Sequence, residues 1–256
     1  MMTNRNIIFD DSAIQDAVAH ARMCYPFEAC GAVINDRFVP FENQARDREN
    51  NFLINDRSFD QAYRAGQVQA VIHSHNDHPH ASQADQEQQQ AMDIPFGIIN
   101  LRNNSVLNVV FWGDGIPREP LCGRQFFYGV WDCFSLVRDF IRERWGLITP
   151  NPTREYGWWH KGVKVFEPFL EGGLPFRPVP LDKIQPDDIL FYGLYGSPIL
   201  NHCGVLMESG LILHHFESHL SRELPPAYQR QYLYRAYRLD VGVDVSTMPG
   251  WERKGE

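Results

Sequence analysis

A stretch of eight residues near the middle of the chain, Gly113 to Pro120, contains two glycines and two prolines and separates two segments of regular hydrophobic periodicity. Glycine and proline interrupt helices and strands, so this stretch is typical of a connection between domains. About half of the 256 residues lie on each side, and a chain of that length can bury a core of its own. We therefore predict two domains, residues 1–116 and 117–256.

Hydrophobic periodicity predicts both helices and strands on each side of this connection. In the first part it predicts helices at 12–24, 58–65 and 82–92 and strands at 29–34, 68–72, 95–101 and 106–112. In the second part it predicts helices at 132–145 and 163–170 and strands at 188–192, 203–207 and 211–216. The expected fold class is α+β in both domains.

Composition excludes several classes of function. The hydrophobic fraction of 43%, with seventeen Phe and six Trp, indicates folded domains throughout. The net charge of −8 and the lack of a Lys/Arg run argue against nucleic acid as a partner. No segment approaches the ~20 apolar residues that span a bilayer, and the N-terminus lacks the apolar stretch of a signal peptide, so we expect a soluble protein made in a cytoplasm. Five scattered cysteines without a C-x-x-C pair indicate no disulfide framework.

Two histidines, His73 and His75, follow the strand predicted at 68–72. Because side chains alternate along an extended chain, both imidazoles project from the same face and can bind one metal ion. Neutral imidazoles suit Zn²⁺, and a carboxylate at the start of the next helix, Asp85, can supply a third ligand and leave the fourth position to water. A catalytic zinc also needs an acidic group that takes a proton from this water, and spacing alone does not choose that group.

The segments around these residues resemble the JAMM (also called MPN) metallopeptidases. The resemblance covers about residues 8 to 115 and is carried by PFEACG at 26–31, HSH at 73–75 and SQAD at 82–85. It implies a mixed sheet with flanking helices and a zinc ion. It also implies roles for five residues: zinc ligands His73, His75 and Asp85, general base Glu28, and hydrogen-bond donor to the oxyanion Ser82.

The loop between the second histidine and the serine departs from the family pattern. Six residues separate His75 from Ser82 where the family usually has seven, and Asn76 stands in place of a common proline. Two other interpretations stay open. The Ser82-x-x-Asp85 pair also fits an N-terminal capping box, which is compatible with metal binding. The nearby His78 and His80 also fit a solvated, histidine-rich loop or an adventitious metal site.

In the second domain, Cys133 lies in the first turn of the helix predicted at 132–145. The helix dipole and the free backbone N–H groups of a first turn stabilise a thiolate and lower the pKa of a thiol. A cysteine nucleophile also needs an imidazole beside the sulfur and a third polar group that orients the imidazole. Cys133 lies on the buried stripe of the helix, however, where a lone cysteine is more often an inert core residue.

The segment 202–214 is predicted to form a hairpin with Glu208-Ser209-Gly210 as its loop. This register pairs Leu206 with Ile212 and Gly204 with His214. Even-numbered residues then share one face, so His202 and His214 become diagonal neighbours while His215 points the other way.

These segments resemble the NlpC-type cysteine peptidases, which have a papain-like core. The resemblance covers about residues 118 to 240 and is carried by YGVWDCFSLV at 128–137, DDILF at 187–191, HCGV at 202–205 and LH at 213–214. It implies Cys133 as nucleophile, His202 as base and acid, and His214 as the orienting residue. Phe134 stands where that family often has Ser, and Cys203 where Val is common.

The order of the two domains, together with the stretch HHFESHLSRE at 214–223, resembles the tail-assembly protein K family of long-tailed bacteriophages. The resemblance implies a role at the tail tip or in tail assembly, with two amide-hydrolysing sites. The implied substrates are peptidoglycan peptides or tail proteins, and the implied partners are other tail-tip proteins. The expected location is the host cytoplasm during assembly, or the virion tail tip.

Two alternatives remain. In the first, the chain is a structural tail-tip component whose inactive enzyme-like domains serve for docking. In the second, it is a host-derived isopeptidase that cleaves protein tags. Zinc content and activity on peptidoglycan would distinguish the three.

Overall fold

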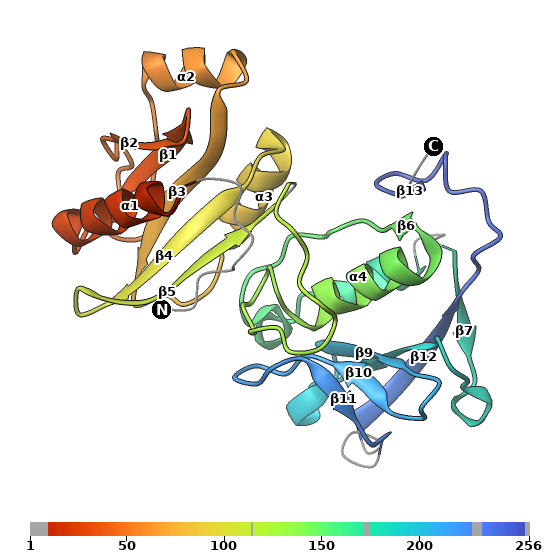
Figure 1. Ribbon diagram of the computed structural model, residues 1–256. Coiled ribbons are helices and arrows are strands. Elements are labelled where there is room, and N and C mark those ends of the chain that lie inside the picture. The colour runs from red at the N-terminus through yellow and green to blue at the C-terminus, as the bar shows by residue number, and fades with distance from the viewer. Residues whose placement is uncertain (1–9, 114, 172–174, 227–231, 254–256) are drawn as a thin grey trace. The chain divides into compact units, whose positions relative to one another are not determined.

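The structure is a computed structural model that describes residues 10–113, 115–171, 175–226 and 232–253. The chain divides into two compact units, residues 1–118 (unit 1) and residues 119–256 (unit 2). The division therefore follows Arg118, whereas the sequence analysis placed it after residue 116. Both units mix helices and strands (Figure 1).

Unit 1 is built on a five-stranded sheet. Its elements are α1 (Asp11–Cys24), β1 (Cys30–Ile34), β2 (Arg37–Phe41), α2 (Arg57–Arg64), β3 (Val68–Asn76), α3 (Gln83–Met92), β4 (Phe96–Arg102) and β5 (Ser105–Trp112). The strand order is β2-β1-β3-β4-β5. Only the β3–β4 pair of this sheet is parallel, and α3 is the connection between those two strands. This crossover brings the start of α3 to the carboxyl end of β3.

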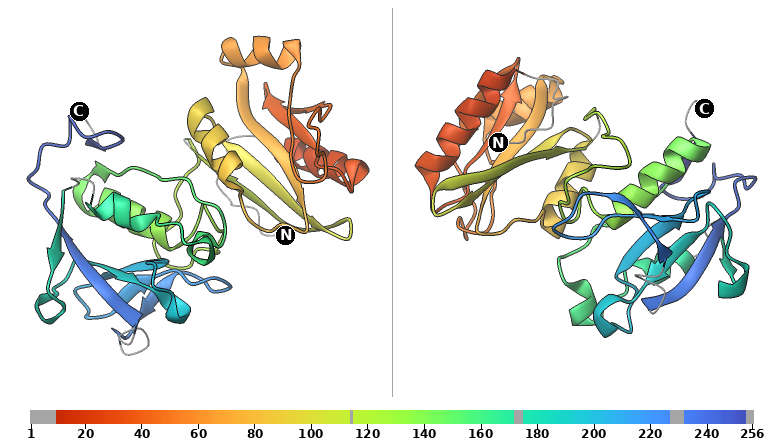
Figure 2. Two further views of the ribbon diagram at one scale, coloured as in Figure 1. Left: turned by 180° about the vertical axis from the view of Figure 1, so that it is seen from behind. Right: turned by 60° about the horizontal axis from the view of Figure 1, so that its bottom comes forward.

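Helix α1, red in Figure 2, packs along the sheet through a stripe of small and apolar residues. Ala13, Ile14, Ala17 and Ala21 are the buried members of this stripe. Asp10 caps the helix, since its carboxylate accepts a hydrogen bond from the Ser12 backbone N–H. Short side chains let the helix approach β1 and β2 closely.

Unit 2 is built on a six-stranded sheet with a long helix packed against it. Its elements are α4 (Cys133–Trp145), β6 (Leu147–Ile148), η1 (Trp158–Lys161), α5 (Phe166–Glu171), β7 (Phe176–Val179), η2 (Leu181–Lys183), β8 (Ile189–Tyr192), η3 (Leu194–Gly196), β9 (His202–Leu206), β10 (Ile212–His214), β11 (Arg222–Leu224), β12 (Leu233–Leu239) and β13 (Glu252–Arg253). The large sheet has the order β11-β10-β9-β8-β12-β7, and all of its strand pairs are antiparallel.

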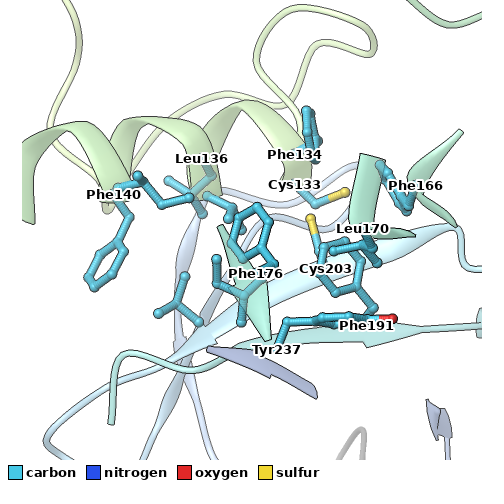
Figure 3. Close-up of a cluster of buried hydrophobic side chains, with 14 of the residues drawn as sticks. Cys133, Phe134, Leu136, Phe140, Phe166, Leu170, Phe176, Phe191, Cys203 and Tyr237 are labelled. Carbon is cyan, nitrogen blue, oxygen red and sulfur yellow. The ribbon is translucent and has the colours of Figure 1, made fainter. Parts of the chain in front are cut away.

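The core of unit 2 lies between α4 and this sheet (Figure 3). Leu136 and Phe140 of α4 meet Phe191 of β8 and Tyr237 of β12 in one buried cluster. Burying side chains of this size contributes about 1.5–3 kcal/mol each, so the cluster fixes the position of the helix on the sheet. The amino end of α4, which begins at Cys133, is thereby held over β9.

A buried arginine ties the start of unit 2 to α4. The Arg124 guanidinium donates to the Asp139 carboxylate of α4 at 2.6 Å and to the backbone oxygens of Pro120 and Glu119 at 2.8 and 2.5 Å. Its backbone N–H donates to the Ser221 hydroxyl at 2.9 Å. With 1% of its surface exposed, Arg124 is part of the interior of unit 2.

Most of the predicted elements are confirmed with small shifts of their ends. The predicted strand at 68–72 continues to Asn76, because β4 runs beside it and pairs His75 with Asn100. Strands β6, β11, β12 and β13 were not predicted from the sequence. Neither were β2 and β7, which contain Pro40 and Pro178. Both are edge strands, where a residue without an N–H is tolerated. Among the residues that the structure describes, no helix is both long and apolar enough to cross a bilayer.

Candidate functional sites

The structure brings the three predicted metal ligands of unit 1 together. The Nε2 atoms of His73 and His75 lie 3.0 Å apart. The Asp85 carboxylate reaches both rings, with Oδ1 at 3.2 Å from His73 Nε2 and Oδ2 at 3.3 Å from His75 Nε2. All three side chains are buried.

These separations fit a divalent cation. Around a tetrahedral zinc ion with bonds of ~2.0–2.1 Å, neighbouring ligand atoms lie ~3.3 Å apart, close to the three measured distances. The Nδ1 atom of His75 lies 3.2 Å from the backbone oxygen of His78. A carbonyl can only accept, so Nδ1 carries the proton and the Nε2 lone pair faces the other two ligands. Phe52 stacks on His73 with ring centroids 4.3 Å apart and holds that ring in place.

The predicted general base lies next to this cluster. Glu28 Oε1 is 3.9 Å from His75 Nε2, and the residue is only 3% exposed. Burial raises the pKa of Glu28 to about 8, His75 opposes this shift, and Asp85 adds to it. A carboxyl group in such a position holds a proton readily, as a base in this place must. Glu28 also lines a cavity of about 440 Å³ that includes Phe27 and Arg48.

Ser74, the middle residue of the HSH segment, fixes the position of Glu28 through its neighbour. Its hydroxyl accepts a hydrogen bond from the Ala29 backbone N–H at 2.8 Å, and its own N–H donates to the Ala29 oxygen at 2.9 Å. Asn43 donates to the Glu28 backbone oxygen at 2.9 Å. The sequence analysis missed both residues, since neither belongs to the metal-ligand pattern.

Ser82 is the N-cap of α3, and the capping box that the sequence allowed is present. Its hydroxyl accepts from the Asp85 N–H at 3.1 Å, and the Asp85 carboxylate accepts from the Ser82 N–H at 2.7 Å. The same carboxylate therefore caps the helix and faces the two histidines. The hydroxyl proton of Ser82 is not used in the cap, so its role as a donor stays a prediction.

In unit 2, a network around Asp132 fixes the first turn of α4. Asp132 Oδ1 accepts from the N–H groups of Phe134 and Ser135 at 3.1 and 3.0 Å. Oδ2 accepts from Arg154 Nε and Nη2 at 3.0 and 2.5 Å and from the Gly129 N–H at 3.1 Å. Burial tends to raise the pKa of Asp132, but the Arg154 charge and these hydrogen bonds outweigh it and hold the pKa below its usual value. The carboxylate is therefore charged and paired.

Cys133 begins α4 directly after this network. A hydrogen bond with the Cys203 thiol is the first cause that lowers the pKa of Cys133 below its ordinary value. Burial opposes the shift, and the charge of His202 and a hydrogen bond with His202 reinforce it. The contact between Cys133 and His202 is the one that the sequence predicted for a nucleophile and its base.

The predicted hairpin has the predicted register. Leu206 pairs with Ile212 and Gly204 pairs with His214. The rings of His202 and His214 lie 5.9 Å apart at 80°. Within the described part of the chain, His202 Nε2 and both ring nitrogens of His214 have no hydrogen-bond partner, so the two rings touch without a hydrogen bond between them. Phe216 stacks on His202 with centroids 4.4 Å apart.

A cavity of about 60 Å³ adjoins the Cys133–His202 pair. It is lined by both of these residues and by His215, and aromatic side chains such as Tyr128 and Trp159 form much of its wall. His215, which the sequence analysis set aside because it points away from the other two histidines, is thus on the side of the nucleophile. His214 is buried, and burial, followed by the charge of His202, lowers its pKa to about 3.

Comparison with known proteins finds relatives among phage proteins. No protein-family model matches the chain. Tail tip assembly protein K of Escherichia phage N15 is 28% identical over 232 residues, which cover 83% of this chain and 87% of the relative. Tail tip assembly protein K of Escherichia phage lambda is 32% identical over 163 residues, which cover 63% of this chain and 76% of the relative.

Solved structures with partial similarity include proteins of the NlpC/P60 family. An NlpC/P60 family protein from Bacillus cereus is 10% identical with a TM-score of 0.34, and the match covers 93% of this chain and 69% of that one. A protein of the NLP/P60 family from Staphylococcus aureus is 15% identical with a TM-score of 0.33, and the match covers 46% and 37%. TM-scores at this level do not establish a common fold.

Proposed function

The chain belongs to the family of tail tip assembly protein K, and from this premise we propose that it takes part in assembling a phage tail tip and carries one amide-hydrolysing site in each unit. The proposed partners are other tail-tip proteins. The proposed substrates are peptidoglycan peptides or tail proteins that need processing. The protein would act in the host cytoplasm during assembly or at the virion tail tip.

For unit 2 we propose a papain-like peptidase of the NlpC type. The observation that carries this proposal is Cys133, the first residue of α4, which lines the same cavity as His202. The Cys133 thiolate attacks the amide carbonyl, and His202 delivers a proton to the leaving amine. His202 then takes a proton from the water that hydrolyses the acyl-enzyme. His214, which packs against the ring of His202, limits the positions that this ring can adopt.

For unit 1 we propose a metallopeptidase of the JAMM type, with zinc held by His73, His75 and Asp85. A zinc ion in this place supplies a Lewis acid for the amide carbonyl and lowers the pKa of water. Glu28, 3.9 Å from His75, receives the proton of the attacking water and passes it to the leaving amine. The Ser82 hydroxyl donates a hydrogen bond to the oxyanion. Support comes from the convergence of three buried ligand atoms within 4.8 Å of one another.

The test incubates the purified full-length protein with muropeptides and with tail-tip proteins, with and without a zinc chelator, and reads the products by mass. We expect Cys133→Ser to abolish one set of cleavages and the chelator or His75→Ala to abolish another. Cys122→Ser is the matched control, because Cys122 is an exposed cysteine of the same unit and its loss should leave cleavage intact.

One observation favours the alternative of a docking protein with inactive sites. Within the described residues neither ring nitrogen of His214 has a hydrogen-bond partner, so the third member of the Cys–His–His set does not orient His202 through a hydrogen bond. If neither substrate is cleaved by the folded protein while the Cys133→Ser/His75→Ala double variant still supports tail assembly, the alternative is correct and the peptidase proposal is wrong.

A further inference from the structure

Two cysteine sulfurs meet at the amino end of α4. Figure 3 shows the sulfur of Cys203, on β9, directed toward the Cys133 side chain at the start of α4, with the sulfur of Cys133 close by in the core of unit 2. The two side chains belong to one buried cluster, and each thiol shifts the pKa of the other. Both are free thiols. Seventy positions separate them in sequence, so they are brought together only by the packing of α4 against β9.

The two thiols differ in access and in charge. Cys133 lines the cavity beside His202 and is 7% exposed, whereas Cys203 is fully buried. Burial, and then the hydrogen bond with Cys133, raises the pKa of Cys203 well above its ordinary value. Cys203 therefore keeps its proton beside the Cys133 thiolate. A small oxidant that enters the cavity meets the reactive thiolate first.

We propose that Cys133 and Cys203 form a reversible disulfide in the presence of a hydroperoxide. While this bond exists, Cys133 cannot act as a nucleophile. The Cys133 thiolate attacks one oxygen of the hydroperoxide, the O–O bond breaks, and Cys133 becomes a sulfenic acid, while the other oxygen leaves as hydroxide or alkoxide and takes up the proton that the Cys133 thiol had released. The sulfur of Cys203 then attacks the Cys133 sulfur and the S–O bond breaks. Water leaves with the proton of Cys203. The two thiols lose two electrons and two protons, and hydrogen peroxide is reduced to two molecules of water.

The position of Cys203 determines the fate of the oxidised nucleophile. A sulfenic acid with no thiol in contact proceeds to sulfinic acid, which ordinary thiols do not reduce. A sulfenic acid beside Cys203 has a partner already in contact. The other cysteines offer no such alternative: Cys24 and Cys30 belong to unit 1, and Cys122 is an exposed residue outside the cluster that holds the pair.

The test uses the reduced full-length protein and reads thiol chemistry by mass, without any peptidase substrate. After treatment with hydrogen peroxide we expect a loss of two hydrogens and a cross-linked peptide that contains Cys133 and Cys203. Labelling of Cys133 by iodoacetamide should disappear with the oxidation and return with dithiothreitol. Because the readout is a covalent bond, the result does not depend on whether unit 2 cleaves amides.

Two variants sharpen the experiment. In Cys203→Val we expect peroxide to abolish labelling of Cys133 irreversibly, with a gain of two or three oxygens. Cys122→Ser should behave as the unsubstituted protein does. If Cys203→Val does not fold, as judged by circular dichroism, Cys203→Ser takes its place. Sulfinic Cys133 without a cross-link in the unsubstituted protein, or recovery by dithiothreitol in the folded Cys203 variant, would overturn the inference.

Discussion

Ser82 and Asp85 bind each other at the first turn of α3, and the bond between them positions the Asp85 carboxylate. The carboxylate accepts from the Ser82 N–H at 2.7 Å, and one of its oxygens lies 3.3 Å from His75 Nε2. The Asp85 carboxylate thus caps the helix and also faces the two histidines. A disturbance of the helix start should therefore reach the proposed metal site.

The first prediction concerns metal content. We expect about one zinc per chain in the unsubstituted protein and close to none in His75→Ala, because two remaining protein ligands do not hold zinc tightly. The measurement is elemental analysis of protein dialysed against trace zinc. His78→Ala is the matched control: His78 is exposed and contributes only its backbone oxygen to the site, which alanine retains.

The same variant tests whether the two sites are independent. His75→Ala should leave the rate of Cys133 alkylation by iodoacetamide unchanged, since Cys203 and His202, which lower the pKa of Cys133, belong to its own unit. A parallel loss of zinc and of thiol reactivity would show that the sites are coupled.

The second prediction concerns the cap. Ser82→Ala should destabilise unit 1 by about 1 kcal/mol, as loss of an N-cap does. It should also weaken zinc binding by roughly 10-fold, because the first turn of α3, which carries the ligand Asp85, loses the hydrogen bond from the Asp85 N–H to the Ser82 hydroxyl. Calorimetric titration with zinc measures the second effect. Asp56→Ala removes the N-cap of α2, which holds no ligand, and should lower stability while zinc affinity stays as it was.

Much of this geometry was predictable from local sequence patterns. A few neighbouring residues are enough to predict that His73 and His75 lie on one face of their strand. The same holds for the turn at 208–210, and both features are present in the structure. Cys133 at the start of its helix is likewise a local property, set by Asp132 and the stripe that follows. These features depend on backbone periodicity, which a single sequence displays directly.

Other features depend on contacts between distant segments, and the sequence does not display those. The contact of Cys133 with Cys203 follows from the packing of α4 on β9. The buried pair of Asp132 with Arg154 joins residues that no local pattern connects. The face on which His215 lies depends on where the strand ends, because β10 stops at His214 and alternation need not hold beyond it.

The third prediction concerns the pH dependence of thiol reactivity. The pKa of Cys133 is lowered, first by the hydrogen bond from Cys203, so its thiolate persists as the pH falls below the ordinary thiol value of ~8.5. Alkylation should therefore lose half its rate only at a pH well below that value. Cys122, whose pKa burial raises, provides an internal comparison in the same digest. A midpoint for Cys133 at or above that of Cys122 would contradict the assignment.

The fourth prediction concerns the buried ion pair beneath the nucleophile. Arg154→Met leaves the Asp132 carboxylate buried without its cation and should cost about 3–5 kcal/mol of stability. Arg144→Met removes a half-exposed partner of Asp187 and should cost less than about 1 kcal/mol. Denaturant titration followed by tryptophan fluorescence measures both, since five of the six tryptophans lie in unit 2.

The same pair predicts how acid acts on unit 2. The folded pKa of Asp132 lies below the unfolded value of ~3.9, so the pair stabilises the fold fully above that pH. The contribution is lost as the pH falls through the lower, folded pKa. In Arg154→Met this acid-dependent part of the stability should be reduced, which titrations at several pH values would show.

The interior placement of Arg124 determines where unit 2 can be trimmed. Its guanidinium binds the backbone oxygens of Glu119 and Pro120 and the carboxylate of Asp139. In a fragment that starts after Arg124, the Asp139 carboxylate of α4 would stay in the interior without its cation. The helix that carries Cys133 would then be less stable. Fragments meant to isolate the thiol site should therefore start at Glu119 or earlier.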